Sequence, residues 1–220
     1  GPDTSSPMSL ETGAGPLAIE LLFSEGRLSF AWMRQPLPTF QSWNGDREAL
    51  AASLGLAASD LHADLPIERG SAGVPFVYIP IASEQALNSA TPGPGLGAAL
   101  RYPETIASAY LFVPPDFHNA QPVSARMFAP GMGIAEDAAT GSAAGPFGAY
   151  LTQHDLAPFD DGLARITVAQ GVRMGRPSRL VVTIERNEGE ISRVRVGGEA
   201  VLVAQGDFFA PESVTPDETA

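Results

Sequence analysis

The sequence of 220 residues contains no cysteine and no lysine, so all 13 of its basic residues are arginines. Without cysteine there is no thiolate nucleophile, no disulfide and no cysteine-ligated zinc. Without lysine there is no Schiff base and no phosphate-binding lysine of the Walker type. Any catalytic chemistry must therefore come from carboxylates, histidines, hydroxyl groups or backbone amides.

Positive charge is also scarce, because 25 acidic residues outnumber the basic ones and give a formal net charge of -12. Nucleic acids and anionic membrane surfaces attract proteins that carry a basic patch. We therefore predict no nucleic-acid partner and no membrane partner. A small anion can still bind where the potential is locally positive, as it is at a helix N-terminus.

Long apolar runs are missing too. The chain has no uncharged apolar stretch of about 18 residues, and it does not begin with a basic region followed by an apolar one. A cytoplasmic location is the expectation. His62, His118 and His154 are far apart and form no metal-binding pattern. We expect surface or loop positions for them, and neither a metal nor a cofactor.

What the sequence does contain is a series of short strand patterns with few helices, and 44% hydrophobic residues to form a core. Residues 17–23 and 27–33 flank a short turn with Gly26 and predict a hairpin. Apolar spacing predicts a helix over 46–54 and a helical turn at 84–87. The other predicted strands cover residues 73–81, 108–113, 123–128, 164–169, 179–184, 191–196 and 199–203.

A shift of 163 residues superposes the hairpin of residues 17–33 on a later one. It places Leu17 on Leu180 and Ser29 on Ser192, and it aligns the two Glu-Gly turns. Either the chain contains a duplicated unit, or two hairpins with similar turns simply look alike. If the unit is duplicated, the first copy has nothing that corresponds to the segment before the second hairpin. The sequence would then resemble the C-terminal two-thirds of something longer.

The segment GMGIAEDAATGSAAGPFGAYL, residues 131–151, has two adjacent acids followed by residues without charge. Thr140 suits a helix N-cap, and the helix that follows, near residues 141–153, is small or apolar on every face. Such a helix must be surrounded, so we expect strands to wrap it. Pro146 should kink or shorten it.

The start of this helix is the candidate binding site. The free amides of Gly141 and Ser142 would bind a carboxylate, and the Ser142 hydroxyl would add a hydrogen bond. Asp137 would exchange a proton with the substrate or orient it. Alternatively, Asp137 only braces the turn before the helix. Glu136 would face the other way and have a structural role.

Several sequence blocks resemble the phenazine-biosynthesis PhzF-like isomerase family. The first group comprises RMFAP at 126–130, GIAED at 133–137, ATGSA at 139–143 and YL at 150–151. The second comprises QG at 170–171, MGRPS at 174–178, VGG at 196–198 and AV at 200–201. Shorter matches at 11–12, 14–15 and 35–36 extend the resemblance over residues 9–206.

The resemblance implies an α+β fold like that of diaminopimelate epimerase. Two pseudo-repeated, β-barrel-like halves would each surround a central helix, with the active site between them and the first half incomplete in this chain. We accordingly expect a flexible lead-in at 1–8, a remnant of the first half at 9–42, the second half at 43–205 and an acidic tail at 206–220.

The resemblance also implies a cofactor-independent isomerase that shifts a proton on a small carboxylated metabolite. Family members use a glutamate and a histidine in a Gly-His-Pro segment, both in the first half, and neither motif occurs here. The implied site residues are therefore Asp137 as catalytic group and Gly141 and Ser142 for substrate binding. Arg176 is expected to fix a strand end more than to bind an anion.

Without its first half, the hairpin at 17–33 would expose strand edges and apolar surface, so the expected partners are a complementing N-terminal half and a second copy in a homodimer. The alternative interpretation is a non-catalytic module that kept half of the cleft and binds a small molecule or another protein.

Overall fold

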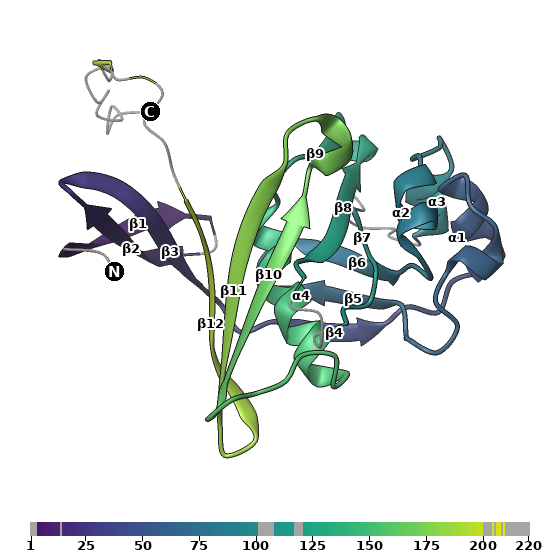
Figure 1. Cartoon of the computed structure of the whole chain (residues 1–220). Helices are drawn as coiled ribbons and strands as arrows, with labels where there is room; N and C mark the ends of the chain where they lie inside the picture. The colour runs from purple at the N-terminus through teal and green to yellow at the C-terminus, as the bar shows by residue number, and fades with distance from the viewer. Residues whose placement is uncertain are drawn as a thin grey trace, which may run out of the picture.

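The computed structural model describes residues 4–13, 15–100, 108–116 and 121–199, with the single residues 204, 206, 207 and 209. Within them, twelve strands form one bent sheet in the order β1-β2-β3-β12-β11-β10-β8-β7-β6-β5-β4, with β9 paired to β8 (Figure 1). The strands are β1 Thr4–Thr12, β2 Gly15–Ser24, β3 Arg27–Gln35, β4 Thr39–Ser42, β5 Glu68–Ser71, β6 Pro75–Pro80, β7 Ala109–Phe112, β8 Val123–Ala129, β9 Ile134–Asp137, β10 Leu163–Gln170, β11 Ser178–Asn187 and β12 Glu190–Gly198.

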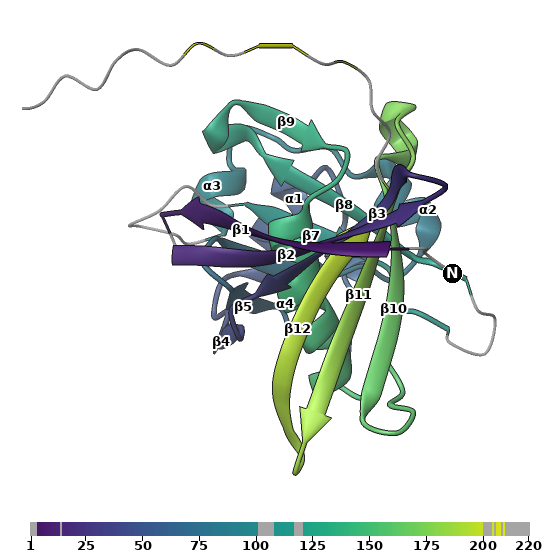
Figure 2. The same cartoon turned by 90° about the vertical axis from the view of Figure 1, so that its left-hand side faces the viewer.

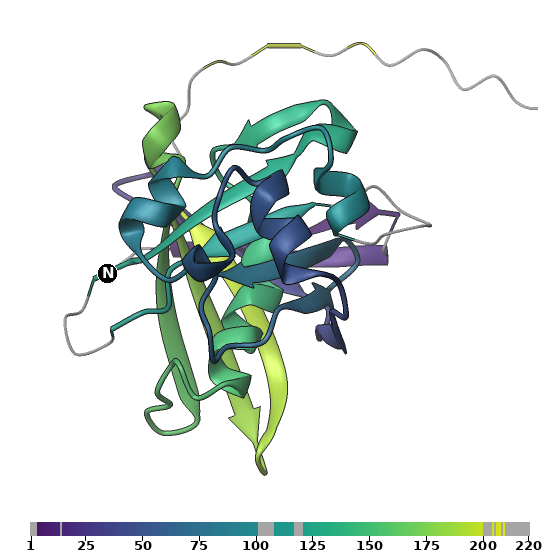
Figure 3. The same cartoon turned by 90° about the vertical axis from the view of Figure 1, so that its right-hand side faces the viewer.

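The described helices fall on opposite faces of the sheet. Those on one face are α1 Arg47–Ser53, α2 Glu84–Ser89 and α3 Leu96–Ala99, and the one on the other is α4 Gly141–Gln153. The inner face of β6 and β7 packs Tyr78 and Tyr110 against α4, while their outer face packs Val77 and Leu111 under α1 to α3. Figure 3 shows α1, α2 and α3 covering that outer face. The sheet therefore separates two hydrophobic cores.

The predicted central helix is confirmed as α4, and the prediction that strands wrap it is correct. Residues 143–152 of this helix are all buried, and β5, β6, β10, β11 and β12 contact it. Close approach explains Gly148, since a Cβ there would lie 2.6 Å from Cγ1 of Val182. Pro146 lies inside the helix without shortening it.

The 163-residue repeat has a structural counterpart. The shift carries the bounds of β2 onto those of β11, and the bounds of β3 onto those of β12. Glu25 and Glu188, in the two turns, have φ angles of 52° and 51°. Their register irregularities also correspond, between Leu22 and Phe23 in one hairpin and between Glu185 and Arg186 in the other. The likeness thus extends well beyond the turn sequence.

The two hairpins meet edge to edge. β3 pairs antiparallel with β12, and Met33 lies opposite Val196, the residue 163 positions later. The pairs on either side are Ala31 with Gly198 and Gln35 with Val194. The shift of 163 residues turns each of these two pairs into the other. A local two-fold axis therefore passes through the Met33–Val196 pair. Figure 2 shows β1 and β2 crossing the direction of β11 and β12, as expected of a strongly twisted sheet.

Some sequence predictions need correction. The flexible lead-in predicted for residues 1–8 is wrong for residues 4–8, which belong to β1 and pair with β2. β4, which was assigned to the first half, pairs with β5 in the sheet around α4, so the pairing favours a boundary near residues 36–38. The strand predicted at 199–203 and the tail at 206–220 fall almost wholly outside the described residues.

The sequence patterns identified several elements at nearly their observed bounds. The predicted helix at 46–54 is α1, with Asp46 as its N-cap, and the turn at 84–87 is part of α2. β4, β5 and β9 were not predicted, because their sequences TFQS, ERGS and IAED are short and mostly polar or small, unlike the equally short but apolar β7. No helix in the described ranges is long and apolar enough to cross a membrane.

Candidate functional site at the start of α4

The two adjacent acids of the opening motif lie on β9 and have different surroundings. Glu136 forms a bidentate ion pair with buried Arg126, with Nε to Oε1 at 2.9 Å and Nη2 to Oε2 at 2.7 Å. The third nitrogen, Nη1, donates to the carbonyl oxygens of Leu87 and Ala90 at the end of α2, at 2.8 Å each. Glu136 thus neutralises a buried arginine that holds α2 to the sheet, in agreement with its predicted structural role.

Asp137 points toward the helix. Its Oδ2 accepts a hydrogen bond of 2.7 Å from the hydroxyl of Thr140, and its side chain is half-buried. Thr140 occupies the N-cap position as predicted, but its side chain makes no capping bond to the helix. Thr140 is therefore the N-cap by its place in the chain only, and its hydroxyl donates to Asp137 instead of capping the helix.

A buried glutamine joins these groups. Gln170, the last residue of β10, is fully buried, and its Nε2 donates to the Asp137 carbonyl oxygen at 2.8 Å and to the Thr140 hydroxyl oxygen at 2.9 Å. Its Oε1 accepts from the Thr140 amide at 3.3 Å and from the Tyr110 hydroxyl at 3.4 Å. All four hydrogen-bonding positions of this amide, two donors and two acceptor directions, are therefore directed at the loop between β9 and α4 or at β7.

Gly171 allows Gln170 to reach this loop. Its φ is +75°, and a Cβ would lie 2.8 Å from the carbonyl oxygen of Ala138. Glycine therefore lets the end of β10 lie directly against the residue after Asp137. The sequence marked residues 170–171 as part of a recognisable block, but gave no signal that Gln170 contacts Asp137 and Thr140.

The two residues predicted to bind substrate stand at the first turn of α4. Gly141 is half-buried and Ser142 is exposed. In the described part of the chain, neither backbone N–H donates a hydrogen bond, as expected for the first residues of a helix. The carbonyl oxygen of Gly141 accepts a 2.8 Å bond from Nε2 of Gln35, which ties β3 to the helix start.

Two buried tyrosines, Tyr110 on β7 and Tyr150 within α4, act as neutral hydrogen-bond donors. Burial raises the pKa of Tyr110, and the charge of Asp137 raises that pKa further. Burial also raises the pKa of Tyr150, with a smaller contribution from Glu68. Both phenols therefore keep their protons at neutral pH, and the Tyr150 hydroxyl donates to the carbonyl oxygen of Pro66 at 2.6 Å.

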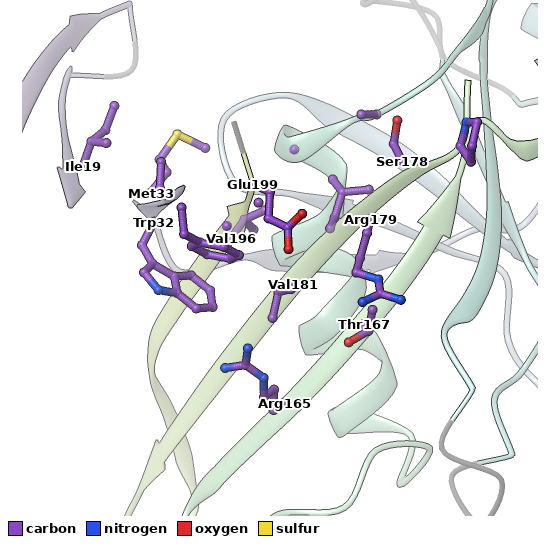
Figure 4. A pocket seen from close by; sticks show the side chains of 18 residues that line it. Ile19, Trp32, Met33, Arg165, Thr167, Ser178, Arg179, Val181, Val196 and Glu199 are labelled. Atoms are coloured by element: carbon purple, nitrogen blue, oxygen red, sulfur yellow. The ribbon is translucent and has the colours of Figure 1, made fainter. Parts of the chain in front are cut away.

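A hollow of about 1010 Å³ reaches the start of α4. It lies where the hairpins β2–β3 and β11–β12 meet, and Ala139 and Gly141 form part of its wall. Asp137 and Ser142 are not among its lining residues. Figure 4 shows the labelled side chains that surround it, which include Ile19, Trp32, Met33, Arg165, Thr167, Arg179, Val196 and Glu199.

The three histidines and Arg176, which the sequence also singled out, lie outside this site or outside the described residues. Nδ1 of His62 accepts from two backbone amides, and Nε2 of His154 lies 2.8 Å from Oε2 of Glu68, so His154 is more than a surface residue. His118 is outside the described residues. Arg176 is exposed and uses only its backbone in the described hydrogen bonds. No three acidic or histidine side chains gather as metal ligands in the described ranges.

The site thus consists of the Asp137 carboxylate, one oxygen of which is hydrogen-bonded to Thr140, and of the helix start beside it, where the N–H groups of Gly141 and Ser142 donate no hydrogen bond in the described ranges. The sequence profile described as "Phenazine biosynthesis-like protein" matches residues 2–206. The chain belongs to this PhzF family. A relative from Pseudomonas aeruginosa, trans-2,3-dihydro-3-hydroxyanthranilate isomerase, is 33% identical over 91% of this chain and 66% of its own length. An uncharacterised isomerase of Mesorhizobium japonicum is 31% identical over 91% of this chain and 67% of its own.

Solved structures agree with the family assignment. A PhzF-family protein of Bacillus anthracis superposes with a TM-score of 0.76 at 26% identity, covering 91% of this chain and 70% of its own. A protein of Agrobacterium radiobacter described as a "probable proline racemase", with a TM-score of 0.58 at 12% identity over 90% of this chain and 58% of its own, shares the fold. This chain therefore has an epimerase-like fold, and it spans about two thirds of the length of the curated relatives it matches.

Proposed function

We propose that this PhzF-family chain forms one wall of an isomerase active site that shifts a proton on a small carboxylated metabolite. The observation that carries the proposal is the hydrogen bond that places Oδ2 of Asp137 at 2.7 Å from Thr140, immediately before the free amides of Gly141 and Ser142. A carboxylate able to accept a proton thus lies beside a helix start suited to an anionic group. The isomerase names of the relatives support the same reaction class.

In this reaction the substrate's carboxylate would lie at the start of α4, where it accepts hydrogen bonds from the amides of Gly141 and Ser142 and from the Ser142 hydroxyl. The helix dipole would favour the negative charge. Asp137 would then remove a proton from the substrate or orient the group that loses it. The reaction moves a hydrogen and a double bond or a stereocentre, so it needs no redox partner, and proton transfer is within the capacity of the residues present.

The facing wall would come from a second half outside these 220 residues, supplied by another chain or by further sequence. The local two-fold axis through Met33 and Val196 supports this, because it would carry α4 to a position against β2 and β3. On that side the described chain places no helix. A homodimer and a cytoplasmic location stay predictions from the sequence.

The test is deuterium exchange from heavy water into trans-2,3-dihydro-3-hydroxyanthranilate, the compound in the relative's name. The chain would be studied alone and joined to the leading third of the P. aeruginosa relative. We expect exchange in the joined protein and at least a hundredfold loss in Asp137→Asn, on the order of a typical acid-base contribution. Asp155→Asn is the matched control, because Asp155 has a positive φ at the far end of α4, a conformation that asparagine also adopts.

A result in which the joined protein binds the compound but catalyses no exchange would favour the alternative, a non-catalytic binding module. In that case Asp137→Asn would leave binding unchanged. If exchange occurs and Asp137→Asn retains the full rate, the role of Asp137 is wrong although the isomerase assignment stands.

A further inference from the structure

The hydrogen bonds around Gln170 have only one possible orientation. The Asp137 carbonyl oxygen can only accept, so the group that faces it at 2.8 Å must be the amide nitrogen Nε2. The Thr140 backbone N–H can only donate, so the group that faces it at 3.3 Å must be Oε1. Both constraints give the same rotamer of the Gln170 amide, and its orientation is settled by chemistry.

This orientation determines where the hydroxyl proton of Thr140 points. Nε2 of Gln170 also contacts Oγ1 of Thr140, at 2.9 Å, and it can only donate there. The Thr140 hydroxyl is therefore the acceptor in that bond, and its own proton remains for Oδ2 of Asp137 at 2.7 Å. A hydroxyl that must donate to Oδ2 favours the charged form of the carboxyl group, because the charged oxygen is the stronger acceptor, and it leaves Oδ1 as the oxygen on which a proton can be carried without bringing two hydrogens together.

We propose that Thr140 is a positioning residue that holds Asp137 in its proton-accepting form, and that the Gln170 amide fixes the direction of their hydrogen bond. The proposal rests on the proposed function, in which Asp137 handles the proton. Oδ2 is occupied by Thr140, while no hydrogen bond to Oδ1 is present in the described ranges. Oδ1 is then the oxygen that faces the substrate and takes up its proton.

The other titratable and charged groups near Asp137 do not act on its carboxyl group as directly as the Thr140 hydroxyl does. Tyr110, on β7, interacts with the charge of Asp137 but stays neutral because burial raises its pKa. Arg126 and Glu136 neutralise each other on the opposite side of β9. Arg173 and Arg176, on the loop after Gln170, are exposed to solvent. The Thr140 hydroxyl is thus the group in direct contact with the carboxyl oxygen.

The test follows the carbon-13 resonance of the Asp137 carboxyl group against pH in the 220-residue chain, and Asp137→Asn identifies the resonance by its loss. In Thr140→Val, which removes the hydroxyl and keeps the shape, the resonance should titrate about one pH unit higher than in the unchanged chain. Thr140→Ser restores the hydroxyl and should titrate like the unchanged chain. If valine prevents folding, Thr140→Ala gives the same comparison.

Thr152→Val is the matched control. Thr152 is a buried threonine of the same helix whose hydroxyl donates to the carbonyl oxygen of Ala149 at 2.9 Å. It should leave the Asp137 titration in place. A Thr140→Val chain that folds and titrates unchanged would overturn the proposal, and so would a Thr140→Ser chain that shifts as far as the valine variant.

The contribution of Gln170 is tested through Thr140. Gln170→Met should also move the titration upward, but it should add nothing in a chain that already carries Thr140→Val, because Gln170 acts by way of that hydroxyl. An equal shift in both backgrounds would show that Gln170 acts on Asp137 independently and would overturn this part. These titrations need no substrate, so they stand or fall separately from the exchange reaction.

Discussion

The three-stranded units β1–β3 and β10–β12 share one hairpin geometry but differ in what covers them. In β10, Ile166 and Val168 are completely buried against α4. In β1, the residues that pair with the corresponding positions of the hairpin are Met8 and Leu10, which are 45% and 47% exposed. Figure 1 shows β1, β2 and β3 extending to one side of the body, away from α4.

The difference teaches that the register of a hairpin is a local property, while its burial depends on a distant element. Both hairpins keep a serine that bonds back across the strand pair, with Ser29 to the Leu22 carbonyl oxygen at 3.0 Å and Ser192 to that of Glu185 at 3.2 Å. These bonds need no third layer. Burial of an apolar face needs one, and of these two units it is β10–β12 that packs against α4.

The largest expected effect contrasts two equivalent aliphatic residues. Ile184 is fully buried under α4, so Ile184→Ala should lower the free energy of unfolding by about 2 to 5 kcal/mol. Leu21, its counterpart 163 residues earlier, is half-exposed, so Leu21→Ala should cost about 1 kcal/mol in this chain. Urea unfolding of both variants measures the difference, and equal losses would contradict the view that the first unit is uncovered.

Features of the fold that depend on residues close together in the sequence could be predicted, and contacts between distant residues could not. The central helix follows from local sequence, because Thr140 and an uncharged run define its start and its buried character. The hairpin repeat follows from matching turns. The hydrogen bonds of Gln170 to Thr140 could not be predicted, since they join residues 30 positions apart and depend on how β10 packs beside the β9–α4 loop.

The site was predicted in part for the same reason. Adjacent residues on an extended strand face apart, and this rule correctly separated Glu136 from Asp137. The partner of Glu136 was not foreseen, because Arg126 reaches it across the β8–β9 pairing and also binds carbonyl groups of α2. The short strands β4 and β5 were missed since TFQS and ERGS have few β-branched or aromatic residues, whereas the equally short β7 was found from its apolar sequence AYLF.

A second test of the difference between β1–β3 and β10–β12 adds a methyl group between α4 and β11. Gly148→Ala places a Cβ 2.6 Å from Cγ1 of Val182, so overpacking should cost about 1 to 3 kcal/mol of unfolding free energy. Gly97→Ala, in α3, is the control because its Cβ would have no neighbour within 4 Å, and alanine there should be neutral or stabilising. Thermal unfolding of the two variants reports the result, and a tolerated Gly148→Ala would mean that α4 is loosely packed.

A third test concerns the point where the two units meet at the helix. Nε2 of Gln35 holds the Gly141 carbonyl oxygen, and a Cβ on Gly145 would collide with Oε1 of the same side chain. Gly145→Ala should therefore be destabilising in the natural background and better tolerated with Gln35→Ala, with a coupling energy of about 0.5 to 3 kcal/mol. A double-mutant cycle from urea unfolding gives this coupling. Simple additivity would show that Gln35 is not what makes glycine necessary at 145.

The smallest expected effect lies on the opposite face of the two hairpins, where one cross-strand pair differs in kind. Glu185 pairs with Arg193 in β11–β12, and the equivalent pair in β2–β3 is Leu22 with Phe30. The Arg193 Nη1 to Glu185 Oε1 distance is 3.1 Å, but the side chains are 46% and 29% exposed, so Arg193→Ala should cost about 0.2 to 1 kcal/mol.

Salt distinguishes the two kinds of pair. The effect of Arg193→Ala should shrink when the ionic strength rises to about 1 M, because exposed charges are then screened within a few ångströms. Phe30→Ala should show no such loss, since Phe30 contacts the Trp32 ring at 4.9 Å between centroids and its contribution is apolar. Unfolding measured at low and high salt compares them. A salt-independent Arg193→Ala would mean that the aliphatic part of Arg193, and not its charge, stabilises this strand pair.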